Sequence, residues 1–285
     1  MKIIIIGGLT NGKILIDYFL KKKNITIELL ITYPENHKIS RYKKLGRLIK
    51  NYKLKSIYDL NANKYYNLIK NIKPDIIFVI GWSGMIDLKI INLPKLGCIG
   101  FHPSKLPFNR GRSVLAWQIE EGETRSAYTA FFMTKKPDAG DLILQQNFKI
   151  NKDDYINSIL DKIDKSLIKM LPKIFFMIKK KKFIRIKQNL NKGSYRKLRD
   201  DSNSKISWNE SAVNIYNKIR AISKPYPGAY YTQKKTKIRV WKSKIMQKKI
   251  YSFNKPGDVL KTYRNGDKIF MTNDKPILIY SNKNK

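Results

Sequence analysis

The first hundred residues alternate short apolar runs with segments whose apolar residues recur at the spacing of a helix. The runs are apolar along nearly their whole length, as are strands buried on both faces. They predict four strands, at residues 2–6, 25–32, 76–80 and 97–101. The segments between them predict three helices, at residues 11–22, about 41–52 and 61–72. This order predicts an α/β fold with a Rossmann-like parallel sheet covered by helices on both faces, whose ligands lie beyond the carboxyl ends of the strands.

The glycine-rich turn after the first strand reads GGLTNG. It lacks the G-x-G-x-x-G spacing of a dinucleotide site. The second strand continues into ITYPENH without an acidic residue placed to hold a ribose. The turn is therefore interpreted as a plain strand-to-helix connection and not as a nucleotide cradle.

The pattern changes beyond Gln145. Residues 154–180 predict a long amphipathic helix despite Pro172, and residues 211–222 predict another helix. The stretch 179–203 between them is polar and basic, as a linker would be. From Ala229 onward, short strands alternate with turns such as Asn265-Gly266, which predicts a small OB-like antiparallel β-barrel. The predicted division is a first domain at 1–190, a linker at 191–204 and a C-terminal helix plus barrel at 205–285.

Composition limits the surroundings in which the chain works. A single cysteine, Cys98, excludes an internal disulfide and a cysteine-cluster metal site, which fits a reducing cytoplasm. The N-terminal MKIIIIGG has no cleavage site of a signal peptide, and no apolar run is long enough to span a bilayer. A soluble, cytoplasmic protein without a membrane partner is therefore expected.

The formal net charge of +38 has two interpretations. Clustered Lys and Arg would favour a partner that carries many phosphates, because binding releases counterions. The lysines also fall on nearly every predicted surface, as they would if the excess were only compositional. The second interpretation is favoured, so charge alone does not establish nucleic-acid binding.

Residues 97–145 hold the candidate chemistry. His102, one of only two histidines, follows the predicted strand at 97–101, and Asp138 lies 36 residues later in a Pro-Asp-Ala-Gly-Asp turn. A scarce histidine in a loop with a carboxylate brought to it is the combination that proton transfer near neutral pH requires.

This stretch resembles the catalytic core of the 10-formyltetrahydrofolate-dependent formyltransferases. The matching positions are His102, Ser104, Leu106, Pro107, Arg110, Gly111, Asp138, Gly140 and Asp141. The strand and loop PDIIFVIGWSGMI before the core and the segment KISWNESAVNIYNKIRAISKPYPGAYY after it are also similar to the family.

The resemblance implies transfer of a formyl group from 10-formyltetrahydrofolate to a primary amine, with no metal. It implies that His102 stabilises the oxyanion of the tetrahedral intermediate and moves a proton, that Asp138 orients the histidine and acts as base, and that Ser104 assists. The family normally has Asn two residues before the histidine, where this chain has Gly100. Ser104, Asn109, a backbone amide or a water would then supply the second donor.

The resemblance also implies where the two substrates bind. The folate would lie beside Trp82, Ser83, Gly84, Met85, Asp138 and Asp141. Trp82 and Met85 could equally be core residues. Arg110 and Arg112 would contact a phosphorylated acceptor, because guanidinium groups bind phosphate in a bidentate manner. The alternative is that these arginines pair with the acidic run Glu120, Glu121 and Glu123.

The acceptor is the least constrained part of the resemblance. Arg110-Gly111-Arg112 is similar to the motif of enzymes that formylate nucleotide-linked amino sugars, and the loop at 33–40 is short for one that must enter a tRNA acceptor stem. The net charge and the small C-terminal domain would suit initiator Met-tRNA. An amino sugar is favoured, with Met-tRNA as the alternative and glycinamide ribonucleotide third. A non-catalytic nucleic-acid-binding relative is a competing class, and a homodimer is compatible with the family.

Overall fold

The computed structural model describes residues 1–35, 37, 45–247 and 254–281. These residues form two compact units, each assembled from separate stretches of the chain. The first unit comprises residues 1–111, 126–148 and 161–195. The second unit comprises residues 112–125, 149–160 and 196–285.

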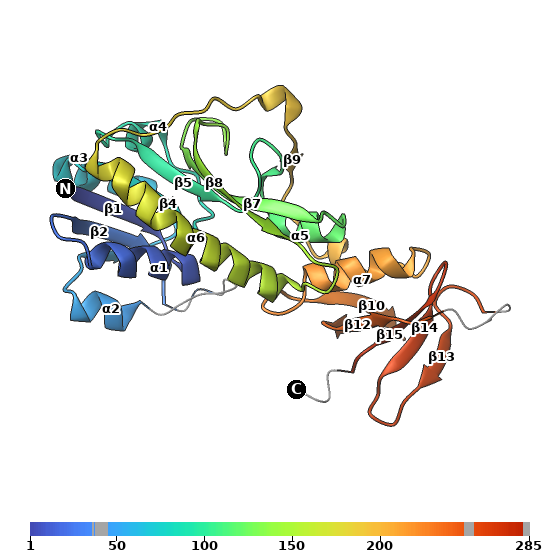
Figure 1. The fold of residues 1–285 in the computed structure, drawn as a ribbon. Helices are drawn as coiled ribbons and strands as arrows, with labels where there is room; N and C mark the ends of the chain where they lie inside the picture. The colour runs from blue at the N-terminus through green and yellow to red at the C-terminus, as the bar shows by residue number, and fades with distance from the viewer. Residues whose placement is uncertain (36, 38–44, 248–253, 282–285) are drawn as a thin grey trace. The chain divides into compact units, whose positions relative to one another are not determined.

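A seven-stranded sheet forms the centre of the first unit (Figure 1). In spatial order its strands are β3 (Ser56–Tyr58), β2 (Thr26–Thr32), β1 (Lys2–Gly7), β4 (Ile76–Ile80), β5 (Cys98–His102), β7 (Arg125–Phe132) and β8 (Leu142–Lys149). The pairs β3–β2, β2–β1, β1–β4 and β4–β5 are parallel, whereas β5–β7 is antiparallel. The predicted α/β fold with a mostly parallel sheet is confirmed.

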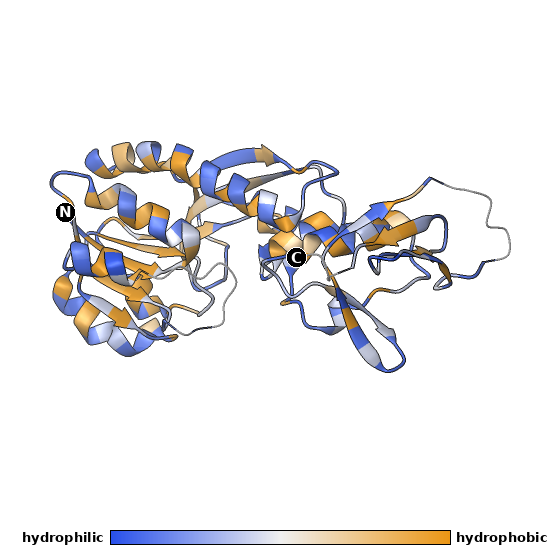
Figure 2. Cartoon of the chain, turned by 90° about the horizontal axis from the view of Figure 1, so that it is seen from below, coloured by the Kyte–Doolittle hydropathy of each residue, from blue (hydrophilic) through white to orange (hydrophobic). Residues whose placement is uncertain are grey.

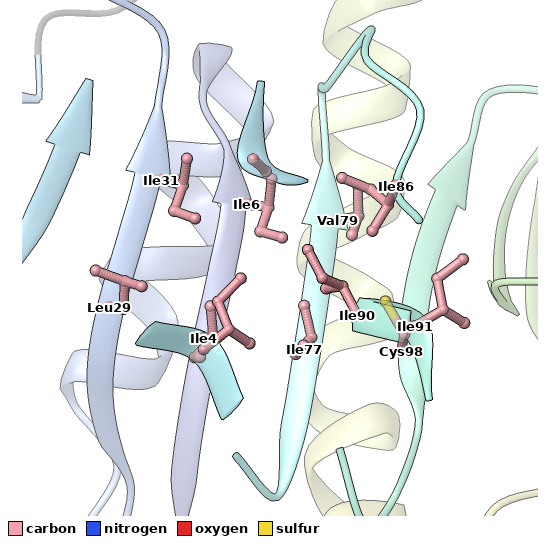
Figure 3. Packing of buried hydrophobic residues seen from close by; sticks show 12 residues of the cluster. Ile4, Ile6, Leu29, Ile31, Ile77, Val79, Ile86, Ile90, Ile91 and Cys98 are labelled. Atoms are coloured by element: carbon pink, nitrogen blue, oxygen red, sulfur yellow. The ribbon is translucent and has the colours of Figure 1, made fainter. Parts of the chain in front are cut away.

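Helices cover both faces of this sheet. On one face the side chains of Ile4, Leu29 and Ile77 pack against α3 (Tyr66–Ile72) and α4 (Leu88–Ile91), as Figure 3 shows in part. Because side chains alternate along a strand, Ile5 and Phe78 point to the other face. There Phe19 of α1 (Leu9–Leu20) stacks on Phe78, with ring centroids 5.2 Å apart. Figure 2 shows these strands as apolar along most of their length.

The helices differ from the predicted ranges at their ends. Helix α1 begins two residues before the predicted 11, because Gly8 rather than Asn11 ends the strand-to-helix turn. The predicted helix at 61–72 is divided into a 3-10 turn at Ala62–Tyr65, which begins at the Asn61 cap, and α3. Helix α2 spans Gly46–Asn51 of the predicted 41–52, whose residues 41–44 lie outside the described part of the chain, as do residues 36 and 38–40 of the predicted loop at 33–40.

The turn between β1 and α1 lies directly against the end of β4. A Cβ at Gly7, whose φ is +143°, would lie 1.8 Å from the carbonyl oxygen of Ile80. Only glycine permits this approach of two backbones. The glycine at position 7 therefore allows two strand ends to pack closely. The interpretation of this turn as a plain strand-to-helix connection fits that packing.

The predicted linker at 179–203 contains more structure than its polarity suggests. Helix α6 spans Ile156–Lys179 with Pro172 inside it, close to the predicted 154–180. After it, Ile186 and Leu142 form an isolated antiparallel bridge. Short strand β9 (Tyr195–Arg196) pairs with β6 (Arg110–Gly111) in a two-stranded sheet.

The second unit combines two helices with antiparallel strands. Its helices are α5 (Val114–Glu120) and α7 (Ala212–Ala221), and its strands are β10 (Ala229–Gln233), β11 (Thr236–Val240), β12 (Ser243–Ile245), β13 (Val259–Thr262), β14 (Lys268–Met271) and β15 (Pro276–Ile279). The strands fall into a β10–β11 pair and a sheet of order β12-β15-β14-β13. Trp208 and Phe270 stack at 4.3 Å between ring centroids in its core. The C-terminal domain is therefore rich in antiparallel strands, as predicted.

None of the helices in the described part of the chain combines the length and the apolar character needed to cross a membrane.

Candidate active site

The structure brings together the histidine and the aspartate that the sequence singled out. His102 is the last residue of β5 and not, as predicted, the first residue of the following loop. Asp138 lies in the turn between β7 and β8. The antiparallel pairing places the end of β7 beside the start of β5, with Phe132 opposite Ile99. The turn after β7 reaches back from there to the end of β5, where the Nδ1 atom of His102 lies 3.6 Å from the Oδ1 atom of Asp138.

His102 is held on both sides of its ring. Its Nε2 atom lies 2.7 Å from the carbonyl oxygen of Asn109, and its Nδ1 atom faces the Asp138 carboxylate. Both neighbours are acceptors. The side chain is 7% exposed, so the imidazole is shielded from water.

Asp138 has one oxygen fixed and one directed at the histidine. Oδ2 accepts a hydrogen bond of 2.8 Å from the backbone N–H of Gly111, and Oδ1 faces His102. Its backbone is left-handed, with φ +53°, which short polar residues adopt more readily than most. The side chain is 19% exposed, so a bound molecule can reach this carboxylate more easily than the imidazole behind it.

Ser104 is fully buried, and its hydroxyl donates to the carbonyl oxygen of Phe108 at 2.7 Å. Its own carbonyl oxygen accepts a hydrogen bond from Thr129 at 2.6 Å. These bonds hold the loop that follows β5. A catalytic part for Ser104 stays a prediction, since its proton is engaged within that loop.

Gly100 lies opposite Phe131 in the β5–β7 pairing. A Cβ atom at position 100 would lie 2.8 Å from Cζ of the Phe131 ring and 3.1 Å from Cγ of Met133. The ring of Phe131 therefore fills the space that a side chain at position 100 would need.

The loop from Ile80 to Met85 is divided between core and surface. Trp82 packs against the hydrophobic cluster on one face of the sheet and stacks on Tyr33, with ring centroids 4.8 Å apart. The Tyr33 hydroxyl accepts a hydrogen bond from the backbone N–H of Ser83 at 2.9 Å. Ser83 and Gly84 are exposed, and Met85 is 63% exposed. The core interpretation thus fits Trp82 in part and does not fit Met85.

A second loop supports this one and was missed by the sequence reasoning. The side-chain amide of Asn63 donates to the carbonyl oxygen of Met85 at 3.0 Å, and its oxygen accepts from the N–H of Asp87 at 2.9 Å. Four residues earlier, a hydrogen bond from the Tyr65 hydroxyl is the main cause that lowers the pKa of Asp59 to about 2. The signal in the sequence was the Asp-Leu-Asn-Ala-Asn run at 59–63, whose side chains cap turns.

Asp141, predicted to lie beside the folate, faces a cation. Its Oδ2 atom lies 3.7 Å from Nη1 of Arg185. The Arg185 guanidinium also lies over the Phe132 ring, 3.6 Å from its centroid.

The two arginines predicted to bind a phosphorylated acceptor occupy different settings. Arg110 is half-buried in β6, and Arg112 is exposed. Two residues of the acidic run have other partners. Glu120 lies 2.5 Å from Arg199 and 3.8 Å from Lys218, and Glu121 pairs with Arg196. Burial is the main cause that raises the pKa of Glu120 above its usual range.

Within the described ranges, no group of three or more His, Cys, Asp or Glu side chains is arranged to hold a metal ion. Cys98 is buried next to the Met133 sulfur at 3.6 Å, and burial raises the pKa of its thiol.

A mostly parallel sheet with a paired histidine and carboxylate at its strand ends defines a Rossmann-like domain suited to acid–base chemistry. Residues 1–175 match the family model for formyl transferase, and residues 199–284 match the model for the formyl transferase C-terminal domain. The chain belongs to the formyl transferase family, which confirms the resemblance found in its sequence.

Curated relatives of two kinds match the chain. The bifunctional polymyxin resistance protein ArnA of Wigglesworthia glossinidia brevipalpis is 34% identical over 245 residues, which cover 85% of this chain and 37% of ArnA. The methionyl-tRNA formyltransferase of Alkaliphilus metalliredigens is 30% identical over 207 residues, covering 73% of this chain and 65% of that protein. The chain thus spans less than two thirds of both relatives.

Solved structures with the same fold include two sugar formyltransferases. WlaRD, a sugar 3N-formyl transferase solved in the presence of dTDP and 5-N-formyl-THF, is 21% identical, has a TM-score of 0.75, and is matched over 98% of its chain and 100% of this one. The N-formyltransferase of Helicobacter canadensis, in complex with folinic acid and dTDP-3-aminofucose, is 20% identical with a TM-score of 0.71, over 99% of both chains.

Proposed function

We propose that the chain transfers a formyl group from 10-formyltetrahydrofolate to a primary amine, most favourably that of a nucleotide-linked amino sugar. The observation that carries the proposal is the His102–Asp138 pair, 3.6 Å apart at the carboxyl end of β5 in a member of the formyl transferase family.

The loop after β4 suits the folate donor. It leaves the sheet at the edge where β5 ends, because Val79 pairs with Gly100. Ser83 and Gly84 are exposed residues, and the exposed Met85 side chain offers apolar contact to a flat ring. We assign this loop, with Trp82, Asp138 and Asp141, to folate binding. When bound, the donor supplies an activated formyl carbon.

The chain's own residues would move the proton and stabilise the charge. Oδ1 of Asp138 is the carboxylate oxygen not held by the backbone, so it is placed to take the proton that an attacking amine must lose. When the bond from the formyl carbon to the folate nitrogen breaks, the same carboxyl group returns this proton to that nitrogen. His102 lies directly behind this carboxyl group, and we assign to the histidine the stabilisation of the negative charge that develops on the formyl oxygen. Shielding of the imidazole from water strengthens both effects, because the local dielectric constant is lower.

Two lines of support favour the amino-sugar acceptor. The first is that structures of sugar formyltransferases match nearly the full length of both chains. The second is the pair of guanidinium groups of Arg110 and Arg112, which we assign to the acceptor's phosphates.

The second candidate acceptor is initiator Met-tRNA. It is favoured by the many Met-tRNA formyltransferases among the sequence relatives and by the net charge of +38. The proposal includes a cytoplasmic location, catalysis in residues 1–190, an antiparallel domain at 205–285, and a homodimer as an arrangement to be measured.

The test is a screen of the purified protein with 10-formyltetrahydrofolate and a panel of acceptors. The panel contains nucleotide-linked 3-amino and 4-amino sugars and charged initiator tRNA, and mass spectrometry detects the formylated product. We expect turnover with a sugar and none with tRNA. His102→Ala and Asp138→Asn should each lower kcat by a factor of about 10² to 10⁴, whereas Asp161→Asn, at an exposed carboxylate of α6, should not.

Robust formylation of tRNA would overturn the assignment of an amino-sugar acceptor, but not the proposed reaction. If the wild-type protein formylates no amine in the panel, the proposal that it is an enzyme is wrong, and the interpretation as a non-catalytic relative is favoured.

A further inference from the structure

We propose that residues 183–194, the strap, position the active site by holding His102 and Asp138 at their working separation, with Gln188 and Ser194 as the positioning residues. The inference rests on the proposed function, because it assigns these residues to the same site. The strap is the part of the predicted linker that directly follows α6 and its last turn.

Gln188 holds the turn that carries Asp138. Its side-chain Nε2 donates to the carbonyl oxygen of Asp138 at 2.9 Å and to that of Gly140 at 2.6 Å. An amide NH2 has two protons, so one side chain satisfies two carbonyl groups that lie outside any helix or ladder. With the Asp138–Ala139 and Gly140–Asp141 peptides tied in this way, the turn holds the Asp138 side chain toward His102.

The strap is anchored to the sheet just before Gln188. Ile186 and Leu142 exchange both backbone hydrogen bonds, at 2.8 and 3.0 Å. Phe183 makes an edge contact with the Phe132 ring at 5.5 Å between centroids, and Arg185 lies over the same ring. These contacts fix where the Gln188 amide can reach.

The turn itself cannot move toward the sheet. A Cβ at Gly140 would lie 1.7 Å from the carbonyl oxygen of Phe132, and the N–H of Phe132 donates to the carbonyl oxygen of Asp141 at 2.9 Å. The turn is therefore confined between β7 on one side and the Gln188 amide on the other.

The end of the strap holds the histidine. The Ser194 hydroxyl oxygen accepts from the N–H of Asn109 at 2.8 Å, and the Ser194 carbonyl oxygen accepts from the N–H of Arg110 at 3.0 Å. Asn109 in turn presents the carbonyl oxygen that lies 2.7 Å from Nε2 of His102. A Cβ at Gly193 would lie 2.4 Å from the carbonyl oxygen of Pro107, so the strap lies directly against this loop.

One segment thus determines both halves of a pair whose members lie 36 residues apart. Misplacement of a reacting group by about 1 Å can cost a factor of about 10² in rate. Loss of one strap contact should therefore lower kcat while leaving substrate binding and the fold intact. A merely structural segment would lower thermal stability without a selective loss of kcat.

The first experiment measures kcat and KM for Gln188→Leu and Ser194→Ala. We expect kcat to fall by about tenfold or more, with KM for both substrates within about twofold. The melting temperature of Gln188→Leu should fall as well, because two carbonyl groups lose their donor, and it is recorded to show that both variants are folded at the assay temperature. The matched control is Ile184→Ala, in the same strap at a side chain that is 59% exposed. Unchanged kcat in both variants, or equal losses in the control, would overturn the inference.

A pH profile separates positioning from general disruption. In Gln188→Glu the introduced carboxyl cannot donate to a carbonyl group while it is ionised, but it can donate once when protonated. The ratio of variant to wild-type kcat should therefore rise as the pH falls from about 8 toward about 5, whereas the ratio for Gln188→Leu should stay level. Parallel profiles for the two variants would overturn the proposed hydrogen bonds.

A third readout does not depend on activity. The chain has two histidines, so the imidazole NMR signals of His102 are assigned by their loss in His102→Ala. At a fixed pH these signals should differ from wild type in Gln188→Leu and in Ser194→Ala, and should match it in Ile184→Ala. A wild type without formyl transfer would defeat the proposed function alone, whereas unchanged His102 signals in both variants would defeat the strap.

Discussion

At position 100 strand β5 has a glycine, and a side chain of the neighbouring strand β7 occupies the space beside it. Gly100 and Phe131 are opposite one another in the β5–β7 pairing, and the Phe131 ring is 3% exposed. The glycine is not required by its backbone conformation but by the ring beside it. The departure from the family motif is therefore part of a packed pair and not an isolated loss.

Restoring an amide side chain at this position should be costly by itself. We expect Gly100→Asn to lower the free energy of unfolding by about 1 to 3 kcal/mol, since overpacking a filled core forces neighbours off their rotamers. Urea denaturation of the variant and of the wild-type protein measures this difference in the free energy of unfolding.

The control is the double variant Gly100→Asn with Phe131→Leu. Contacting residues are not additive, so this variant should lose less stability than the two single changes together. A strictly additive result would mean that the ring is not what excludes a side chain at position 100.

At the residue scale, the sequence indicated the pair that we propose to react, but not the residues that we propose to hold it. His102 and Asp138 could be found because a scarce histidine and a Pro-Asp-Ala-Gly-Asp turn are unusual in any chain. Gln188 stands among lysines and isoleucines with no local pattern, and its role depends on carbonyl groups about fifty residues away. Long-range hydrogen bonds of a single amide leave no periodic signal.

At the scale of the elements, the loop from Asp59 to Tyr65 contains a carboxyl group whose pKa can be measured. The pKa of Asp59 falls from an ordinary value of 3.8 to about 2, with the Tyr65 hydroxyl as the largest cause and Lys64 as a smaller one. A folded-state pKa below the unfolded one stabilises the protein fully above a pH of about 4, and this contribution is lost as the pH falls through about 2.

Tyr65→Phe should therefore raise the pKa of Asp59 toward its ordinary value and make unfolding by acid begin at higher pH. Carboxyl-carbon NMR titration of Asp59 provides the measurement. Lys64→Gln, at the residue with the smaller effect, should move the pKa less. A larger shift in Lys64→Gln than in Tyr65→Phe would contradict this assignment.

The elements that the sequence predicted well are those whose pattern is dictated by burial. Strands β1, β2 and β4 are apolar along most of their length because helices cover both faces of the sheet. Their neighbours were harder to delimit. His102 extends β5 by one residue through its pairing with Thr129. Polarity alone predicts a linker at the strap, because it cannot reveal a segment that pairs through its backbone and a few side chains.

For the whole molecule, the net charge of +38 makes ionic strength a sensitive variable. A nucleotide-linked sugar carries about two phosphates, so its KM should rise by about tenfold or less between 50 and 200 mM salt. A tRNA acceptor with six to ten phosphate contacts should lose about 10³ to 10⁵ in affinity over the same range.

The measurement is KM or the dissociation constant at several salt concentrations, with a neutral osmolyte as the control for water activity. A steep dependence for the acceptor that the protein formylates would contradict the amino-sugar assignment, even if the reaction itself were observed.

The interleaving of the two units has a consequence for how the chain is made. Ile119 of α5 is fully buried, and its carbonyl oxygen accepts a hydrogen bond of 3.3 Å from Arg220 of α7, about a hundred residues later. Synthesis proceeds from the N-terminus, and completed domains fold as they emerge. The first unit has all its residues once Tyr195 is out, while α5 must wait for α7. On the ribosome, then, the first unit can fold before the second. During that interval the apolar residues of α5 are still uncovered, and a chaperone can bind them.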